Sequence, residues 1–130
     1  MSYLQRLADV KRQLGIPTIV VICGSTRFWE EMAAAAWAET LRGRIVVRPD
    51  VDMKRPGQGY ADAAAVKTDL DELHRAKIRL ASEVLVVGDY IGDSTRREIA
   101  YAQELGRPIR FTHPEIAPTV MSERTLPSMN

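Results

Sequence analysis

Glu98 is the residue of this chain best placed to do chemistry. It follows a continuous apolar run, residues 84–87, and a turn that contains two glycines. A buried strand, a glycine-bearing loop and the first turn of a helix form the usual ligand-facing corner of an open α/β sheet. A carboxylate at that corner can serve as a nucleophile. The helix dipole and the neighbouring Arg96 and Arg97 favour its ionised form.

The same segment also fits a structural role. Thr95 and Glu98 have the spacing of a capping box. In that motif the glutamate side chain accepts a hydrogen bond from the backbone N–H of the cap residue. The sequence leaves the two interpretations open, and they are partly compatible.

A helix predicted over residues 61–80 supplies partner groups for this carboxylate. A helix rises about 1.5 Å per residue and a five-residue strand spans about 17 Å. Residues near Glu72 should therefore lie level with the far end of the strand that starts near Glu83. The candidates for acid–base work are Asp69, Asp71 and His74. The structural alternatives are a solvated face, with Asp71 and Arg75 as an i,i+4 ion pair, and a partly buried histidine bonded to backbone.

Two turns carry the groups predicted to bind a substrate. The turn 24–26 follows an apolar, β-branched run, and its N–H groups and hydroxyls suit a phosphate or ribose at a helix N-terminus. A tight turn with a Ser or Thr N-cap is the alternative. The predicted binding residues are Cys23, Gly24, Ser25, Thr26, Arg27, Tyr90, Gly92, Asp93, Ser94, Thr95, Arg96 and Arg97.

The single cysteine, Cys23, excludes an internal disulfide, and a reducing compartment follows as the expectation. Its apolar neighbours predict a small buried side chain rather than a nucleophile, since no histidine is placed nearby in sequence to activate it. The only histidines are His74 and His113, and neither has a ligand-like partner at short spacing. The sequence therefore predicts no metal site, and no cofactor is expected.

Apolar runs alternate with helical patterns along the chain. Strands are predicted over 18–23, 44–48, 83–88 and 108–111, and helices over 2–14, 27–42, 61–80 and 95–105. This alternation predicts an α/β fold with an open, mainly parallel sheet of four to five strands and helices on both faces, of the Rossmann or flavodoxin type. Ligands of such sheets bind beyond the carboxyl ends of the strands.

Two further segments complete the predicted organisation. Residues 49–60 are rich in proline and glycine and should form a long loop that serves as a lid. Residues 1–111 are predicted to be a single domain. Residues 112–130 contain three prolines and little periodicity, and are predicted to be an extended tail.

The bulk properties narrow the classes of protein to consider. The chain has 130 residues, of which 45% are hydrophobic and 27% charged, which is typical of one globular domain with its own core. A net charge of +1 calls for neither a nucleic-acid polymer nor a membrane surface as partner. No apolar stretch approaches the length of a membrane-spanning helix, so a cytoplasmic location is expected.

With these residues laid out, the chain resembles the nucleoside 2-deoxyribosyltransferase-like superfamily. That group includes deoxyribosyltransferases and nucleotide N-glycoside hydrolases. The resemblance covers about residues 18–111 and is carried by the order of four segments: 21–25, 69–74, 81–87 and 92–100. The closest likeness is to a branch with a YIGxSTRREIxYA segment, which here runs from Tyr90 to Ala102.

The resemblance implies a reaction and roles for particular residues. Glu98 matches the family's nucleophile, which attacks the sugar C1′ and displaces the base, as in a retaining glycosidase. The position of the acid that assists the departing base is held by His74; Asp69 or Asp71 would take it if the helix is shifted. The family's first-strand tyrosine falls at about Val21. Its loop aspartate falls near Gly92, beside Asp93.

The polar residues before and around Glu98 suggest a substrate, and the resemblance implies partners. Ser94, Thr95, Arg96 and Arg97 would hold a 5′-phosphate, which favours a nucleoside 5′-monophosphate over a free nucleoside or deoxynucleoside. A homodimer or a larger homo-oligomer is expected, with a neighbour closing the site. The alternative hypothesis, from a different functional class, is a non-catalytic nucleotide-binding or sensing module on the same fold.

Overall fold

The computed structural model describes residues 2–50 and 63–125 and contains a four-stranded parallel sheet. The strands are β1 (Ile19–Cys23), β2 (Ile45–Val47), β3 (Glu83–Val86) and β4 (Ile109–Phe111), in the order β2-β1-β3-β4. The β-branched runs explain the two central strands, because strands covered on both faces need apolar residues at every position. The predicted open parallel α/β fold is confirmed.

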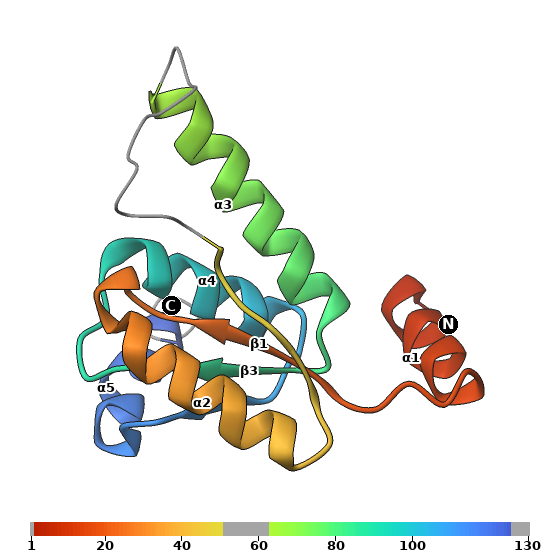
Figure 1. Ribbon diagram of the computed structural model, residues 1–130. Coiled ribbons are helices and arrows are strands. Elements are labelled where there is room, and N and C mark those ends of the chain that lie inside the picture. The colour runs from red at the N-terminus through yellow and green to blue at the C-terminus, as the bar shows by residue number, and fades with distance from the viewer. Residues whose placement is uncertain (1, 51–62, 126–130) are drawn as a thin grey trace.

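Helices cover both faces of the sheet, as predicted (Figure 1). The α-helices are α1 (Tyr3–Gln13), α2 (Trp29–Leu41), α3 (Ala63–Leu80), α4 (Asp93–Glu104) and α5 (Ala117–Thr125), and the short 3₁₀ helices are η1 (Thr26–Phe28) and η2 (Pro114–Ile116). Figure 1 shows α2 in front of the strands and α4 behind them. No helix in the described part of the chain is long and apolar enough to cross a membrane.

Alternate residues of β1 pack into the hydrophobic core on opposite faces of the sheet. Val21 and Cys23 pack with Ile78 of α3 and Ile99 of α4 on one face. Val20 and Ile22 pack with Met32 of α2 on the other face. Each fully buried aliphatic side chain of this kind stabilises the fold by about 1.5–3 kcal/mol. The helices that carry the predicted site are thus fixed to the sheet through their apolar faces.

The strand order determines where a ligand can bind. From β1 the chain crosses to β2 on one side, and from β3 it crosses to β4 on the other side. The carboxyl ends of the adjacent strands β1 and β3 therefore border a topological switch point, where open parallel sheets bind ligands. The loops that follow these strands begin at Gly24 and Val87.

The prediction of an extended tail after residue 111 is wrong for residues 112–125. Residues 114–125 form η2 and α5, and Val120 is buried in the same core cluster as Ile99. Pro114 stands at the first position of its helical turn, where a proline lacks no necessary hydrogen bond. Residues 126–130 of the predicted tail lie outside the described residues. Most of the predicted lid does too, and only Pro49 and Asp50 of it are described.

The N-terminal helix α1 differs from the other α-helices because it buries no residue. It lies to one side of the sheet in Figure 1. The side chain of Lys11 donates a hydrogen bond to the backbone carbonyl of Leu80 at 2.8 Å. This contact joins α1 to the C-terminal end of α3.

Candidate functional site

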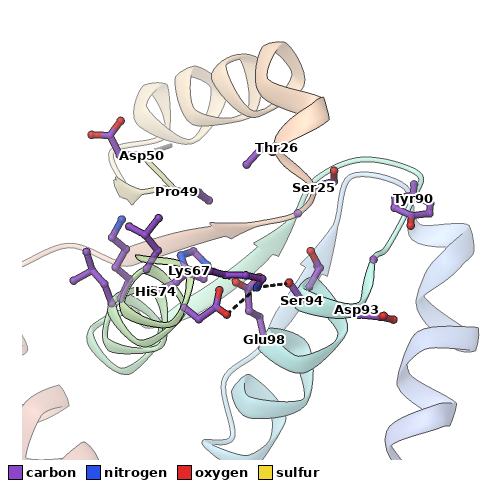
Figure 2. Close-up of a pocket in the computed structure, with 17 residues that line it drawn as sticks. Ser25, Thr26, Pro49, Asp50, Lys67, His74, Tyr90, Asp93, Ser94 and Glu98 are labelled. Atoms are coloured by element: carbon purple, nitrogen blue, oxygen red, sulfur yellow. Dashed lines mark hydrogen bonds and ion pairs between the residues drawn. The ribbon is translucent and has the colours of Figure 1, made fainter. Parts of the chain in front are cut away.

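A cavity of about 510 Å³ opens at the carboxyl ends of β1 and β3 (Figure 2). Most of the predicted site residues line it: Gly24, Ser25, Thr26, Asp71, His74, Tyr90, Gly92, Asp93, Ser94, Thr95 and Glu98. Its other lining residues are Pro49, Asp50, Lys67, Leu70, Leu73 and Lys77. Segments far apart in sequence therefore meet at the predicted edge of the sheet.

Glu98 reaches this cavity from the second turn of α4, and its side chain is 20% exposed. Burial raises the pKa of its carboxyl to about 7, and the charge of Asp71 acts in the same direction. The charges of Arg97 and Lys67 oppose this shift but are outweighed. The expectation that the helix and its arginines favour the ionised form is therefore wrong in net effect, because the loss of hydration dominates.

The capping-box interpretation of Glu98 is also wrong. Helix α4 begins at Asp93 with Gly92 as its N-cap residue, and no side chain caps it. Thr95 lies within the helix instead of at the cap and is buried, with 3% of its surface exposed. The carboxylate of Glu98 therefore faces the cavity and not the helix terminus.

His74 lies between the cavity and the sheet, and it is buried. Its Nε2 atom is 3.5 Å from Oε2 of Glu98. Burial lowers the pKa of His74 to about 4, the charge of Lys77 lowers it further, and Asp71 opposes the shift. The imidazole is therefore neutral near pH 7. A positively charged His74 that protonates a departing base is not supported at that pH.

Cys23 is fully buried, as predicted, and does not line the cavity. Its Sγ atom lies 3.4 Å from Nε2 of His74, so the expectation that no histidine lies beside it is wrong. The two residues are 51 positions apart, and only the packing of α3 against β1 brings them together. Burial raises the pKa of the thiol well above its usual value, and the charge of Glu98 acts in the same direction. The thiol therefore stays protonated.

Cys23, His74 and Glu98 form a group whose sulfur, nitrogen and carboxylate oxygen atoms lie within 4.8 Å of one another. These atom types are those that bind transition metals. The prediction of no ligand set considered only short sequence spacings, whereas these three residues come from β1, α3 and α4. Long-range convergence of this kind leaves no local spacing signal.

Lys67 is a site residue that the sequence analysis missed. Its ammonium group lies 3.0 Å from Oδ2 of Asp71 and 3.5 Å from Oγ of Ser94, and it thus connects α3 to α4. Figure 2 shows its side chain pointing toward Ser94. Extending the face that holds His74 and the predicted Asp71 by one more turn toward the N-terminus would have found Lys67.

The structural alternative for Asp71 was an ion pair with Arg75. The structure pairs Asp71 with Lys67 instead. Arg75 lies over the ring of Tyr101 instead, 5.4 Å from its centre. Asp69 is exposed and does not line the cavity, so the structure does not bring it to Glu98.

Three predicted arginines lie around the cavity and not in its lining. The guanidinium of Arg27 stacks over the ring of Tyr90, 4.2 Å from its centre. Arg97 donates a hydrogen bond to Oγ of Ser94 at 3.3 Å and lines a small neighbouring hollow of about 30 Å³ with Glu98. Arg96 is partly exposed on α4.

The turn after β1 is set by Gly24 and Ser25. Gly24 has φ +149°, and a Cβ atom there would meet the carbonyl oxygen of Val87 at 2.6 Å. A glycine is needed here because β1 and β3 come so close at their ends. The side chain of Ser25 accepts a hydrogen bond from the backbone N–H of Arg27, which confirms the N-cap interpretation of this turn.

Comparisons with protein-family models, with curated proteins and with solved structures give no match to this chain. The family resemblance drawn from the sequence therefore stays a prediction.

Proposed function

We propose that this protein cleaves or transfers the N-glycosidic bond of a nucleoside, a deoxynucleoside or a nucleoside 5′-monophosphate, with Glu98 as nucleophile. One observation carries the proposal: the partly exposed carboxylate of Glu98 borders a cavity of about 510 Å³ at the switch point of the sheet. Small-molecule sites in proteins have volumes of about 300–1,000 Å³. The family resemblance predicts the same residue.

The chemistry follows from the position of this carboxylate. Ionised Glu98 attacks the sugar C1′, the C1′–N bond breaks with its electron pair leaving on the base, and a glycosyl ester of Glu98 remains. Water or a second base then attacks C1′, the ester bond breaks and the carboxylate is restored, and the proton that the attacking group loses neutralises the released base. A pKa of about 7 leaves roughly half of Glu98 ionised at neutral pH, which is sufficient for this step.

Asp71 and Lys67 are the groups best placed to assist the departing base. Both line the cavity, and their side chains are in contact at 3.0 Å. The ammonium group of Lys67 can donate a hydrogen bond to the base as negative charge develops on it. Asp71 orients that ammonium group, and its own charge favours a positively charged transition state at the sugar. Neutral His74 then serves to position Glu98.

The rim of the cavity suits a phosphate-bearing substrate. Ser94 lies in the first turn of α4, where backbone N–H groups point outward and attract anions. Arg97 is already hydrogen-bonded to the Ser94 hydroxyl. Tyr90, held by Arg27, offers an aromatic face at the same rim for a base.

A homodimer or larger assembly is part of the proposal, and the amphipathic α1, which buries no residue on its own chain, supports it.

A second candidate function is a non-catalytic nucleotide-binding module. The raised pKa of Glu98 favours it, because a carboxyl group that stays partly protonated can recognise a ligand as a hydrogen-bond donor. The same cavity and rim would then bind the nucleotide without breaking it.

One experiment separates the two functions. The protein is incubated with a panel of nucleosides and 5′-nucleotides, and free base is measured by chromatography. Release that disappears in Glu98→Gln and persists in Glu104→Gln, at the far end of the same helix, supports the proposed reaction. Release that survives in Glu98→Gln removes Glu98 as nucleophile. Binding of a nucleotide without release of base supports the binding module.

A further inference from the structure

The Nε2 atom of His74 is the point at which three potential metal ligands meet. It lies 3.4 Å from Sγ of Cys23 and 3.5 Å from Oε2 of Glu98. Since one nitrogen faces both partners, the three residues do not form a relay in which the two ring nitrogens serve different groups. They surround a common point instead.

We infer that Cys23, His74 and Glu98 form a binding site for one thiophilic divalent metal ion, with Zn²⁺ the best match. Zinc bonds of about 2.3 Å to sulfur and about 2.0–2.2 Å to nitrogen and oxygen, at tetrahedral angles, separate S from N by roughly 3.5 Å and N from O by roughly 3.4 Å. The S–N and N–O separations here are 3.4 Å and 3.5 Å. Sulfur and oxygen lie within 4.8 Å, and a tetrahedral ion would hold them roughly 3.6 Å apart, so the Glu98 side chain would turn toward Cys23 on binding.

The donor types and their surroundings also suit this ion. Sulfur, imidazole and carboxylate form a mixed set typical of zinc, whereas magnesium and calcium prefer oxygen alone. Nε2 of His74 faces both other donors, and in the tautomer with the proton on Nδ1 it offers its lone pair to the metal. The thiol of Cys23 loses its proton to the solvent as the metal–sulfur bond forms.

The cavity provides a path for the metal and a fourth ligand. His74 and Glu98 line the cavity, while Cys23 lies behind them at the end of β1. An ion entering through the cavity would meet the carboxylate and the imidazole first and the sulfur last. Three protein ligands leave one position open toward the cavity for water or a ligand atom.

This metal site does not depend on the proposed glycosidase activity. If the protein both binds the metal and cleaves the glycosidic bond, the metal-bound form is inactive, because a carboxylate bound to zinc cannot attack a sugar carbon. Bound Zn²⁺ would then stop the release of base, and removing it with a chelator would restore the activity. If the glycosidase proposal fails, metal binding is still measurable by spectroscopy.

The test uses the full chain, stripped of metal by a chelator and titrated with Co²⁺. A Co²⁺–thiolate bond gives a charge-transfer band in the near ultraviolet, which reports directly on Cys23. The expected result is a band that saturates at a single equivalent of Co²⁺ and disappears when Zn²⁺ is added. A folded wild-type protein without such a band would overturn the proposal.

Variants locate the site. Cys23→Ser should abolish the band, and Glu98→Gln should weaken Zn²⁺ binding at least tenfold, since even residues behind the ligands of known sites change affinity about 10–100-fold. Circular dichroism shows whether each variant is folded, and Glu98, being partly exposed, is the more tolerant position.

The control is His113→Ala. His113 is the other histidine of the chain and contacts Glu31 and Glu115 at 3.5 Å and 3.3 Å, so it is the alternative place for a stray ion. This variant should bind Zn²⁺ like the wild type. Binding that is lost in His113→Ala, or a band that persists in Cys23→Ser, would overturn the assignment.

Discussion

The Nε2 atom of His74 lies 3.5 Å from Oε2 of Glu98, and near neutral pH the imidazole is uncharged while about half of the carboxyl is ionised. Burial lowers the pKa of His74 to about 4 and raises that of Glu98 to about 7. Both shifts favour the neutral form, so the contact is not an ion pair near neutral pH, although its distance would allow one. This pair controls how the site responds to pH.

Glu98→Gln should stabilise the protein at alkaline pH. Between pH 4.5 and about 7 the folded state holds the Glu98 proton more tightly than the unfolded chain does, so this group lowers the stability as pH rises. The variant removes that cost and should be more stable than the wild type by up to about 3 kcal/mol at about pH 8. Urea unfolding measures it. An equal difference at about pH 4 would contradict this origin, because Glu98 is then protonated in both states.

The release of base should increase with pH through about 7, as Glu98 becomes ionised. The charge of Asp71 contributes to that high pKa, so Asp71→Asn should shift the midpoint of the kcat/KM profile to lower pH. Asp69→Asn is the matched control, since Asp69 lies on the same helix but not in the cavity. A midpoint that moves equally in both variants would contradict the role of Asp71.

Glu39 holds a charge network between α2 and the strands. Its side chain is only 4% exposed and accepts hydrogen bonds from Arg44, at 3.0 Å, and from Arg110. Glu39→Ala leaves these arginines without their buried partner and should lower the free energy of unfolding by about 2 kcal/mol. This is less than the loss of one partner costs in a fully buried ion pair, because both arginines are partly hydrated. Arg42→Ala removes a weaker, exposed contact at 3.7 Å and should cost less than about 0.5 kcal/mol. Thermal unfolding of both variants is the measurement.

The acidic limb of the stability curve reports on the same network. Although burial alone would raise the pKa of Glu39, the hydrogen bonds and charges of Arg110 and Arg44 lower it. Its contribution to stability is therefore present above the unfolded pKa of 4.5 and is lost as pH falls through the folded value. Glu39→Ala should lose this acid dependence, and an unchanged acid limb would contradict the assignment.

Gly24→Ala should destabilise the fold more than an alanine at another glycine with positive φ. A Cβ at Gly24 would meet the carbonyl oxygen of Val87 at 2.6 Å, which adds a steric cost to the backbone strain. Gly15 has φ +70° and no atom within 4 Å of a built Cβ, so Gly15→Ala should cost only about 1 kcal/mol. Chemical denaturation compares the two, and equal losses would show that the approach of β1 to β3 is unimportant.

Much of the fold could be predicted because its signals are local and periodic. The β-branched run at β1 and the apolar run at β3 each cover a strand that is buried on both faces, and the structure confirms them. Helix α5 escaped prediction because Pro114 and Pro118 suggested a break, whereas a proline is tolerated in the first turn of a helix. The prediction that Thr95 caps α4 was wrong because the helix begins two residues earlier than predicted.

The site was predictable only in part. The edge of the sheet, and with it Glu98, His74 and the turns, follows from topology. The environment of these groups does not follow, because the pKa of a carboxyl group depends on its hydration as well as on its neighbours in sequence. The contact of Cys23 with His74 depends on how α3 packs on β1, and no residue spacing encodes that packing.

Helix α5 places part of the support for Glu98 far from the cavity. Val120 belongs to the same core cluster as Ile99, the residue next to Glu98, and Met121 contacts Gln103 at 3.3 Å. A chain cut short before Ala117 would therefore leave the rear of α4 in water while every cavity-lining residue was still present. Damage at the C-terminus would then look like a defect in ligand binding, although no described residue of α5 lies within reach of the ligand.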